Sequence, residues 1–126
     1  MQFDEERPIY LQVKEIICRL IAAGELLPGQ KVPSIRELAL HYKVNPNTIQ
    51  RALRELESEG VIFTRRGQGN FVTEEENRIG ELRRQMVEER GRNFVSTARS
   101  LGFGKDDIVK IILEITDREI GEEEEI

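Results

Sequence analysis

Apolar residues in the first part of the chain recur at the spacing of an amphipathic helix. They are Ile9, Leu11, Val13, Ile16, Ile17, Leu20 and Ile21, which share one face of a helix, and Pro8 precedes them at the expected first helical position. We expect Gly24 to end this helix. The segment from Gly24 to Pro33 holds two glycines and two prolines, which predicts a connector that crosses the surface.

Two shorter helices are expected next. Ser34 precedes Glu37 by three positions, the spacing at which each side chain bonds a free backbone amide at a helix start. Asn45 as N-cap and Pro46 as first residue predict a further helix that ends at Gly60. Two helices joined by so short a turn form a helix-turn-helix. The inward face of its second helix is predicted to consist of Ile49, Ala52, Leu53 and Leu56.

A β-hairpin is predicted directly after these helices. Residues 61–64 and 70–73 are short β-prone runs, and the sequence between them is Arg-Arg-Gly-Gln-Gly. Glycine adopts positive φ without strain, which suits the tip of a hairpin. A hairpin in this position is the wing of a winged helix-turn-helix.

The chain beyond residue 73 is rich in Glu and Arg and has helical spacing. We expect two helices separated by the sequence LGFGKDD, with Gly91 as a possible kink or break in the first. Two helices of this length cannot bury all of their own apolar residues, so we expect a second copy of the chain to cover the remaining apolar face. The alternative is that the isoleucines pack on the chain's own N-terminal domain. The residues assigned to dimerisation are Ile79, Leu82, Met86, Phe94, Ile108, Ile111, Ile112 and Ile115.

The predicted fold is therefore mainly α with a small β-hairpin. Residues 1–73 are assigned to a winged helix-turn-helix domain and residues 74–126 to a helical dimerisation tail. A run of four glutamates at 122–125 repels itself and is expected to fray into solvent.

The formal net charge of −5 at first argues against a nucleic-acid partner. Residues 1–73, however, hold ten Lys and Arg against nine Asp and Glu, whereas the tail holds nine against fifteen. Between Lys31 and Val72 seven basic residues face only four acidic ones. Because charges are screened over about 8 Å at physiological salt, a local basic surface persists in an acidic chain. Binding to DNA is therefore not excluded.

Several classes of protein are excluded by the residue inventory. One cysteine, Cys18, permits no internal disulfide and is expected to be a small buried apolar residue, and one histidine leaves too few ligands for structural zinc. Without a spaced acid–base pair, we expect no enzyme and no cofactor. No apolar run reaches about 18 residues and no signal region follows Met1, so we expect a cytoplasmic protein without a membrane partner.

The start of the third predicted helix has the side chains that read bases. Asn and Gln pair bidentately with adenine and Arg with guanine in the major groove, and a recognition helix presents them from its N-terminal turns. The arginines of the wing suit phosphate or minor-groove contacts. The residues assigned to binding double-stranded DNA are Ser34, Arg36, Asn45, Asn47, Thr48, Gln50, Arg51, Arg54, Arg65, Arg66, Gly67 and Gln68.

Simpler roles stay open for these residues. Capping alone explains Asn45, and Arg65 and Arg66 could cover a solvated turn. Helix-turn-helix corners also occur without DNA, so an adaptor that binds protein is the alternative function.

The stretch PSIRELALHYKVNPNTIQRALRELESEGVIFTRRGQGNFV resembles the winged-helix signature of GntR-type regulators. The resemblance spans roughly residues 8–72, and the sequence NPNT with a short helical tail is similar to the YtrA subfamily. It implies a dimeric DNA-binding regulator, usually a repressor, of a subfamily that controls transporter operons, with an unknown effector. Many members begin the recognition helix with arginine, whereas Pro46 stands here, so the operator sequence does not follow from the resemblance.

Overall fold

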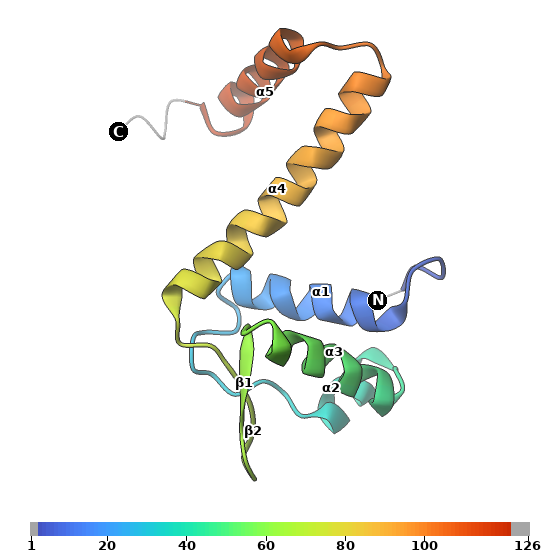
Figure 1. Cartoon of the computed structure of the whole chain (residues 1–126), viewed down its shortest axis with the longest axis vertical. Coiled ribbons are helices and arrows are strands. Elements are labelled where there is room, and N and C mark those ends of the chain that lie inside the picture. The colour runs from blue at the N-terminus through green and yellow to red at the C-terminus, as the bar shows by residue number, and fades with distance from the viewer. Residues whose placement is uncertain (1–2, 122–126) are drawn as a thin grey trace. The chain divides into compact units, whose positions relative to one another are not determined.

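The computed structural model describes residues 3–121, and the chain divides into two compact units, residues 1–84 and 85–126. Within residues 3–121, five helices and one two-stranded antiparallel sheet confirm the predicted fold (Figure 1). The elements are α1 (Ile9–Ala22), α2 (Ile35–Tyr42), α3 (Pro46–Ser58), β1 (Ile62–Arg65), β2 (Gly69–Val72), α4 (Glu76–Ser100) and α5 (Lys105–Glu119).

The core of unit 1 lies between α3 and the helices α1 and α2, both of which pack against it. The predicted inward face of α3 is confirmed, with Ile49, Ala52 and Leu56 at 0% exposure. Val13 and Ile17 of α1 complete this core. Removal of these side chains from water is the main stabilising contribution to a domain of this size.

The predicted starts of α2 and α3 are confirmed. Ser34 and Glu37 form the reciprocal capping box, and the Asn45 side chain accepts a hydrogen bond from the Asn47 amide at 2.8 Å. Between the helices Lys43 adopts φ 56°, the left-handed conformation that turns the chain. Pro8, expected as the first helical residue, is instead the N-cap of α1, one position earlier.

The connector between α1 and α2 contains an extended segment that sequence patterning missed. The Val32 amide donates to the Asn70 carbonyl at 2.8 Å, and the Val72 amide donates to the Gln30 carbonyl at 2.9 Å. Lys31 bridges antiparallel to Phe71, and Val32 is only 2% exposed. The prediction of a plain surface connector is therefore wrong here, because this segment pairs with the open edge of β2.

The wing is the predicted hairpin, with each strand displaced by one residue from its expected bounds. Its register pairs Ile62 with Val72 and Arg65 with Gly69. Gly67 and Gly69 adopt φ values of 78° and 110° at and beside the tip. These positive values are the reason that the turn requires glycine at both positions.

Replacement of Gly69 by alanine is expected to destabilise unit 1 by about 1–2 kcal/mol. The new Cβ would lie 3.2 Å from Lys31 Cε, and an L side chain rarely adopts φ 110°. Chemical denaturation of Gly69→Ala measures the loss. Gly80→Ala is the matched control, because nothing lies within 4 Å of its Cβ position, and stability equal to that control would contradict the prediction.

The first turns of α4 belong to unit 1. Ile79 and Leu82 are 4% and 6% exposed, and Arg83 Nε donates to the Ala22 carbonyl at 2.9 Å. Their assignment to dimerisation is corrected, because the chain's own core already covers both side chains. The helix then continues through Gly91 without a break.

Unit 2 contains the rest of α4 together with α5. Leu101, Gly102 and Phe103 form the turn that was expected from the sequence, and the Phe103 amide donates to the Ala98 carbonyl at 3.0 Å. Within the described part of this unit only Ala98 and Ile108 are buried. The assignment of Ile108 to dimerisation is therefore corrected as well, because the chain itself covers this side chain. No described helix has the length and apolar character to cross a membrane.

Candidate nucleic-acid interface

Helix α3 is held from two sides, and these contacts determine which of its faces is free. On one side Lys14 of α1 pairs with Glu55 at 3.3 Å and with Glu59. On the other side Glu57 accepts a hydrogen bond from Thr64 of the wing. The free face lies between α1 and the wing, opposite the buried residues of the helix.

Three predicted base readers occupy this free face. Asn47, Gln50 and Arg54 are exposed and project away from the buried side of α3. Gln50 stands two helical turns before Glu57, and residues at that spacing share a side of a helix, so Gln50 lies toward the wing. We call Asn47, Gln50 and Arg54 the reading face.

Arg51, a predicted reader of guanine, is turned toward α1. Its Cζ lies 3.7 Å from the centroid of the Tyr10 ring, and its Nε lies 3.7 Å from Glu55 Oε2. Thr48, also predicted, is half-buried, whereas Asn45 is exposed but serves as the N-cap. The structure therefore separates these three residues from the reading face.

Two phenylalanine rings of the wing support the side chain of Arg65. The rings of Phe63 and Phe71 stack with centroids 5.7 Å apart, and Arg65 Cζ lies 5.4 and 4.9 Å from the two centroids. Arg66 and Gln68, on either side of Gly67, are exposed at the tip. The arrangement presents two guanidinium groups beside a backbone that can approach a phosphate closely.

Further cations lie near the wing and at the start of α2. Arg36 is exposed one residue after the helix begins, beside the capping residue Ser34. Lys31 lies over Gly69, beside the tip of the wing, and is a candidate that the sequence favours only weakly, because no helix or turn motif marks it. The backbone amide and hydroxyl of Ser34, with Lys31, hold the pKa of Glu37 below its ordinary value, so Glu37 stays ionised near neutral pH.

The ion pairs between α1 and α3 fix the position of the recognition helix. Partial burial acts to lower the pKa of Lys14, but hydrogen bonds and attraction to Glu59 and Glu55 outweigh it and the pKa lies above its ordinary value. Lys14 therefore remains charged across the physiological range. Lys14 thus offsets part of the negative charge that Glu55 and Glu59 place on this side of the domain.

The thiol of Cys18 is expected to react slowly. Burial, and then the negative charge of Glu59, raise the pKa of Cys18 from 9.0 to about 11. Since only the thiolate is nucleophilic, alkylation by iodoacetamide at pH 8 should be roughly a hundredfold slower than that of a free thiol. The rate should keep rising up to about pH 11, and mass spectrometry measures it. A rate that levels off near pH 9 would contradict the expectation.

These features together define a class of protein. A helix with exposed amides and an arginine, flanked by an arginine-tipped wing, suits the major groove and its bordering phosphates. The chain is a winged helix-turn-helix DNA-binding protein. The family model described as bacterial regulatory proteins, gntR family, matches residues 9–72, and the chain belongs to this family of transcriptional regulators.

Relatives are similar along almost the whole chain. The chain is 42% identical over 116 residues to the uncharacterized HTH-type transcriptional regulator YhcF of Bacillus subtilis, covering 92% of this chain and 96% of the relative. It is 36% identical over 110 residues to the HTH-type transcriptional repressor YtrA of the same organism, covering 86% and 85%. The predicted resemblance to YtrA-like members is thereby confirmed.

Solved structures agree with this assignment. A GntR family transcriptional regulator from Listeria monocytogenes matches with a TM-score of 0.82 and 39% identity, over 89% of this chain and 98% of that one. The DNA-binding domain of AraR, in complex with operator ORX1, matches with a TM-score of 0.52 and 38% identity, over 58% of this chain and 89% of that one.

Proposed function

We propose that the protein represses transcription as a homodimer on a palindromic operator. Each copy places its reading face in one of two successive major grooves, about 34 Å apart, while the wings contact the flanking phosphates or minor groove. The observation that carries this proposal is the free face of α3 beside the wing, where Asn47, Gln50 and Arg54 are exposed together. The name of the relative YtrA supports repression, and the operator complex of AraR supports the mode of binding.

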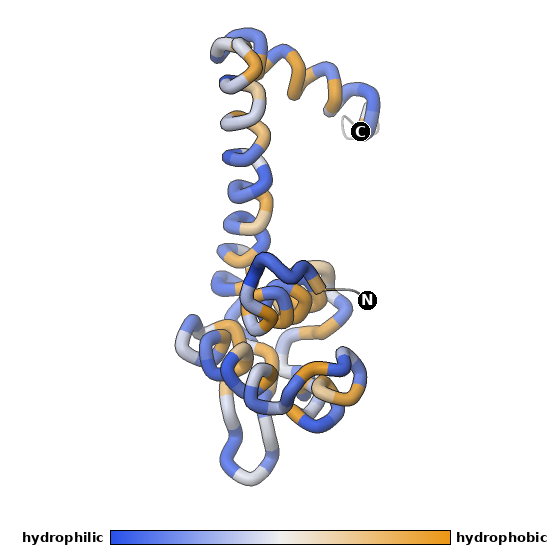
Figure 2. The backbone as a smooth tube through the Cα atoms, turned by 90° about the vertical axis from the view of Figure 1, so that its right-hand side faces the viewer, coloured by the Kyte–Doolittle hydropathy of each residue, from blue (hydrophilic) through white to orange (hydrophobic). Residues whose placement is uncertain are grey.

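The amino-acid distribution of unit 2 supports association with a second copy. Among residues 3–121, nine of the eleven exposed large hydrophobic side chains lie beyond residue 84. Figure 2 shows apolar residues recurring along α5. A pair of helices with so small a core of its own is stabilised when a partner covers these residues. We define the tail surface as Val95, Val109, Ile112, Leu113 and Ile115, which are 39–58% exposed.

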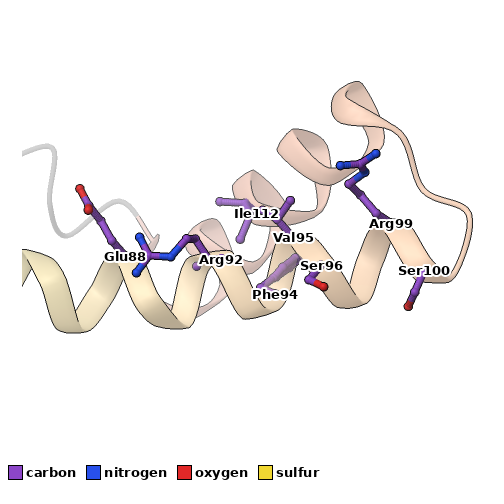
Figure 3. A pocket seen from close by; sticks show the side chains of 9 residues that line it. Glu88, Arg92, Phe94, Val95, Ser96, Arg99, Ser100 and Ile112 are labelled. Atoms are coloured by element: carbon purple, nitrogen blue, oxygen red, sulfur yellow. The ribbon is translucent and has the colours of Figure 1, made fainter.

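A cavity of about 980 Å³ opens within unit 2, between the end of α4 and α5. Phe94, Val95 and Ile112 give it an apolar wall, and Arg92 and Arg99 project at its rim (Figure 3). Five of the residues assigned to dimerisation are only partly covered by the chain itself: Met86, Phe94, Ile111, Ile112 and Ile115. The proposed occupant of this space is the tail of the second copy.

In this proposal the protein acts by binding DNA and not by catalysis. It does so in the cytoplasm, where operator DNA lies. Its affinity should depend steeply on salt, because each phosphate contact releases counterions. The wing arginines Arg65 and Arg66 contribute this sequence-independent part, while Gln50 and its neighbours select the bases.

Selection of bound duplexes from a random pool tests the proposal. The purified full chain should enrich an inverted repeat whose half-sites lie about one helical turn, roughly 10 base pairs, apart. Enrichment of single half-sites would contradict the dimer. A pool that stays random, with no salt-dependent binding to duplex DNA, would contradict DNA recognition altogether and favour an adaptor that binds protein.

A further inference from the structure

The aromatic ring of Tyr10 lies directly against a cation of the recognition helix. Arg51 Cζ is 3.7 Å from the ring centroid, a distance at which the guanidinium contacts the face of the ring. The Arg51 side chain nevertheless remains 60% exposed. Tyr10 thus fixes one side of this guanidinium and leaves the other open to solvent.

Helices α1 and α3 run in the same sense where they meet. Tyr10 contacts Arg51, and Lys14, one turn further along α1, contacts Glu55 and Glu59, one and two turns further along α3. Tyr10 therefore lies level with the first half of α3, which also carries Asn47 and Gln50 of the reading face. Arg51 stands at the boundary between this reading face and α1.

The contacts of Arg51 leave its donors available. A guanidinium that stacks through its flat face keeps its N–H groups in the plane, where they can bind a bidentate acceptor such as phosphate. Glu55 competes for the same donors, but its carboxylate is shared with Lys14 at 3.3 Å. The distance of 3.7 Å from Arg51 Nε to Glu55 exceeds a hydrogen bond. Tyr10 therefore orients the Arg51 guanidinium, and the N–H donors of this group remain available to bind a phosphate.

We propose that Tyr10 is a positioning residue for DNA binding, whose ring holds the Arg51 guanidinium ready for a backbone phosphate beside the recognition helix. The proposal rests on the proposed function and adds α1 to the DNA-contacting elements. It also changes the role of Arg51: this arginine adds affinity for every sequence, whereas the sequence pattern alone assigns it to reading guanine.

Fluorescence anisotropy with two labelled duplexes tests this role over a series of salt concentrations. One duplex is taken from the random-pool selection and the other is its scrambled counterpart. Arg51→Ala should weaken both by the same factor and lower the slope of log affinity against log salt by about 0.9 per lost contact. Tyr10→Leu should weaken both about three- to tenfold. Tyr10→Phe keeps the ring and should stay within about twofold of wild type.

The double variant with Tyr10→Leu and Arg51→Ala distinguishes a loss of Arg51 positioning from a general loss of folding. In the Arg51→Ala background, Tyr10→Leu should cost nothing further, because its partner is gone. Independent, multiplicative losses would overturn the proposal, as would wild-type binding by Tyr10→Leu or a change in base preference with Arg51→Ala. Thermal unfolding monitored by circular dichroism verifies that each variant is folded.

A second variant decides the matter if Tyr10→Leu does not fold. Arg51→Lys keeps the charge but lacks the flat group that stacks, so both duplexes should bind at least about threefold more weakly with an unchanged salt slope. Binding equal to wild type would overturn the proposal. These results differ from failure of the proposed function itself, in which the wild-type chain binds neither duplex.

Discussion

Leu113→Glu is expected to convert the proposed homodimer to a monomer and to weaken operator binding by about a hundredfold or more. Leu113 is 58% exposed and lies in the tail surface, so the charge does not disturb the chain's own packing. In a dimer the same carboxylate would be buried among apolar side chains, which is strongly unfavourable. Loss of the dimer removes the high effective concentration with which the second half-site is bound.

Sedimentation equilibrium and anisotropy with the selected duplex measure these two effects. Asn93→Glu is the matched control, because it adds the same charge to an exposed position of α4 in the same unit and Asn93 lies outside the lining of the cavity. The control should remain dimeric and bind normally. A Leu113→Glu variant that remains dimeric would show that the two copies associate through a surface other than the tail surface.

Gln50→Ala is expected to weaken base selection while leaving general affinity for DNA intact. Gln50 is exposed on the reading face, on the side of α3 nearest the wing, where its amide can make a bidentate pair with adenine. Loss of one such pair costs about 1–3 kcal/mol per half-site, which is roughly a 5- to 150-fold loss of affinity in each half-site. Binding to the scrambled duplex, which depends on phosphate contacts, should change less than about twofold.

The comparison of both duplexes by anisotropy gives the ratio of specific to general binding. Gln85→Ala is the matched control, since it makes the same truncation at an exposed position of α4. Equal weakening of both duplexes by Gln50→Ala would assign Gln50 to a phosphate and leave Asn47 and Arg54 as the base readers. Wild-type affinity for both duplexes would show that Gln50 contacts neither bases nor phosphates and would contradict the present reading face.

Local patterns predicted the helices and the hairpin because their causes are local. The capping box at Ser34, the Asn-Pro start of α3 and the glycines of the wing act within a few residues. The strand bounds differ by one residue from those expected, and α1 begins one residue later. The reason is that the ends of helices and strands depend on hydrogen bonds that no sequence pattern specifies.

Pairing between distant segments was outside the reach of such patterns. The segment from Gly24 to Pro33 is predicted to be a loop from its two glycines and two prolines, yet residues 29–32 within it pair with β2 because that strand has an open edge beside them. Ile79 and Leu82 have the same apolar spacing as the tail residues, and only tertiary structure decided that unit 1 covers them.

The sequence by itself determined the winged helix-turn-helix, the identity of the exposed polar residues on α3 and the arginines of the wing, because spacing and capping fix which side of each helix is apolar. Only tertiary structure decided how those polar residues divide among neighbours. Arg51 turns to Tyr10 while Gln50 lies toward the wing, and this division follows from how α1 and the hairpin pack on either side of one helix, which a linear pattern does not encode.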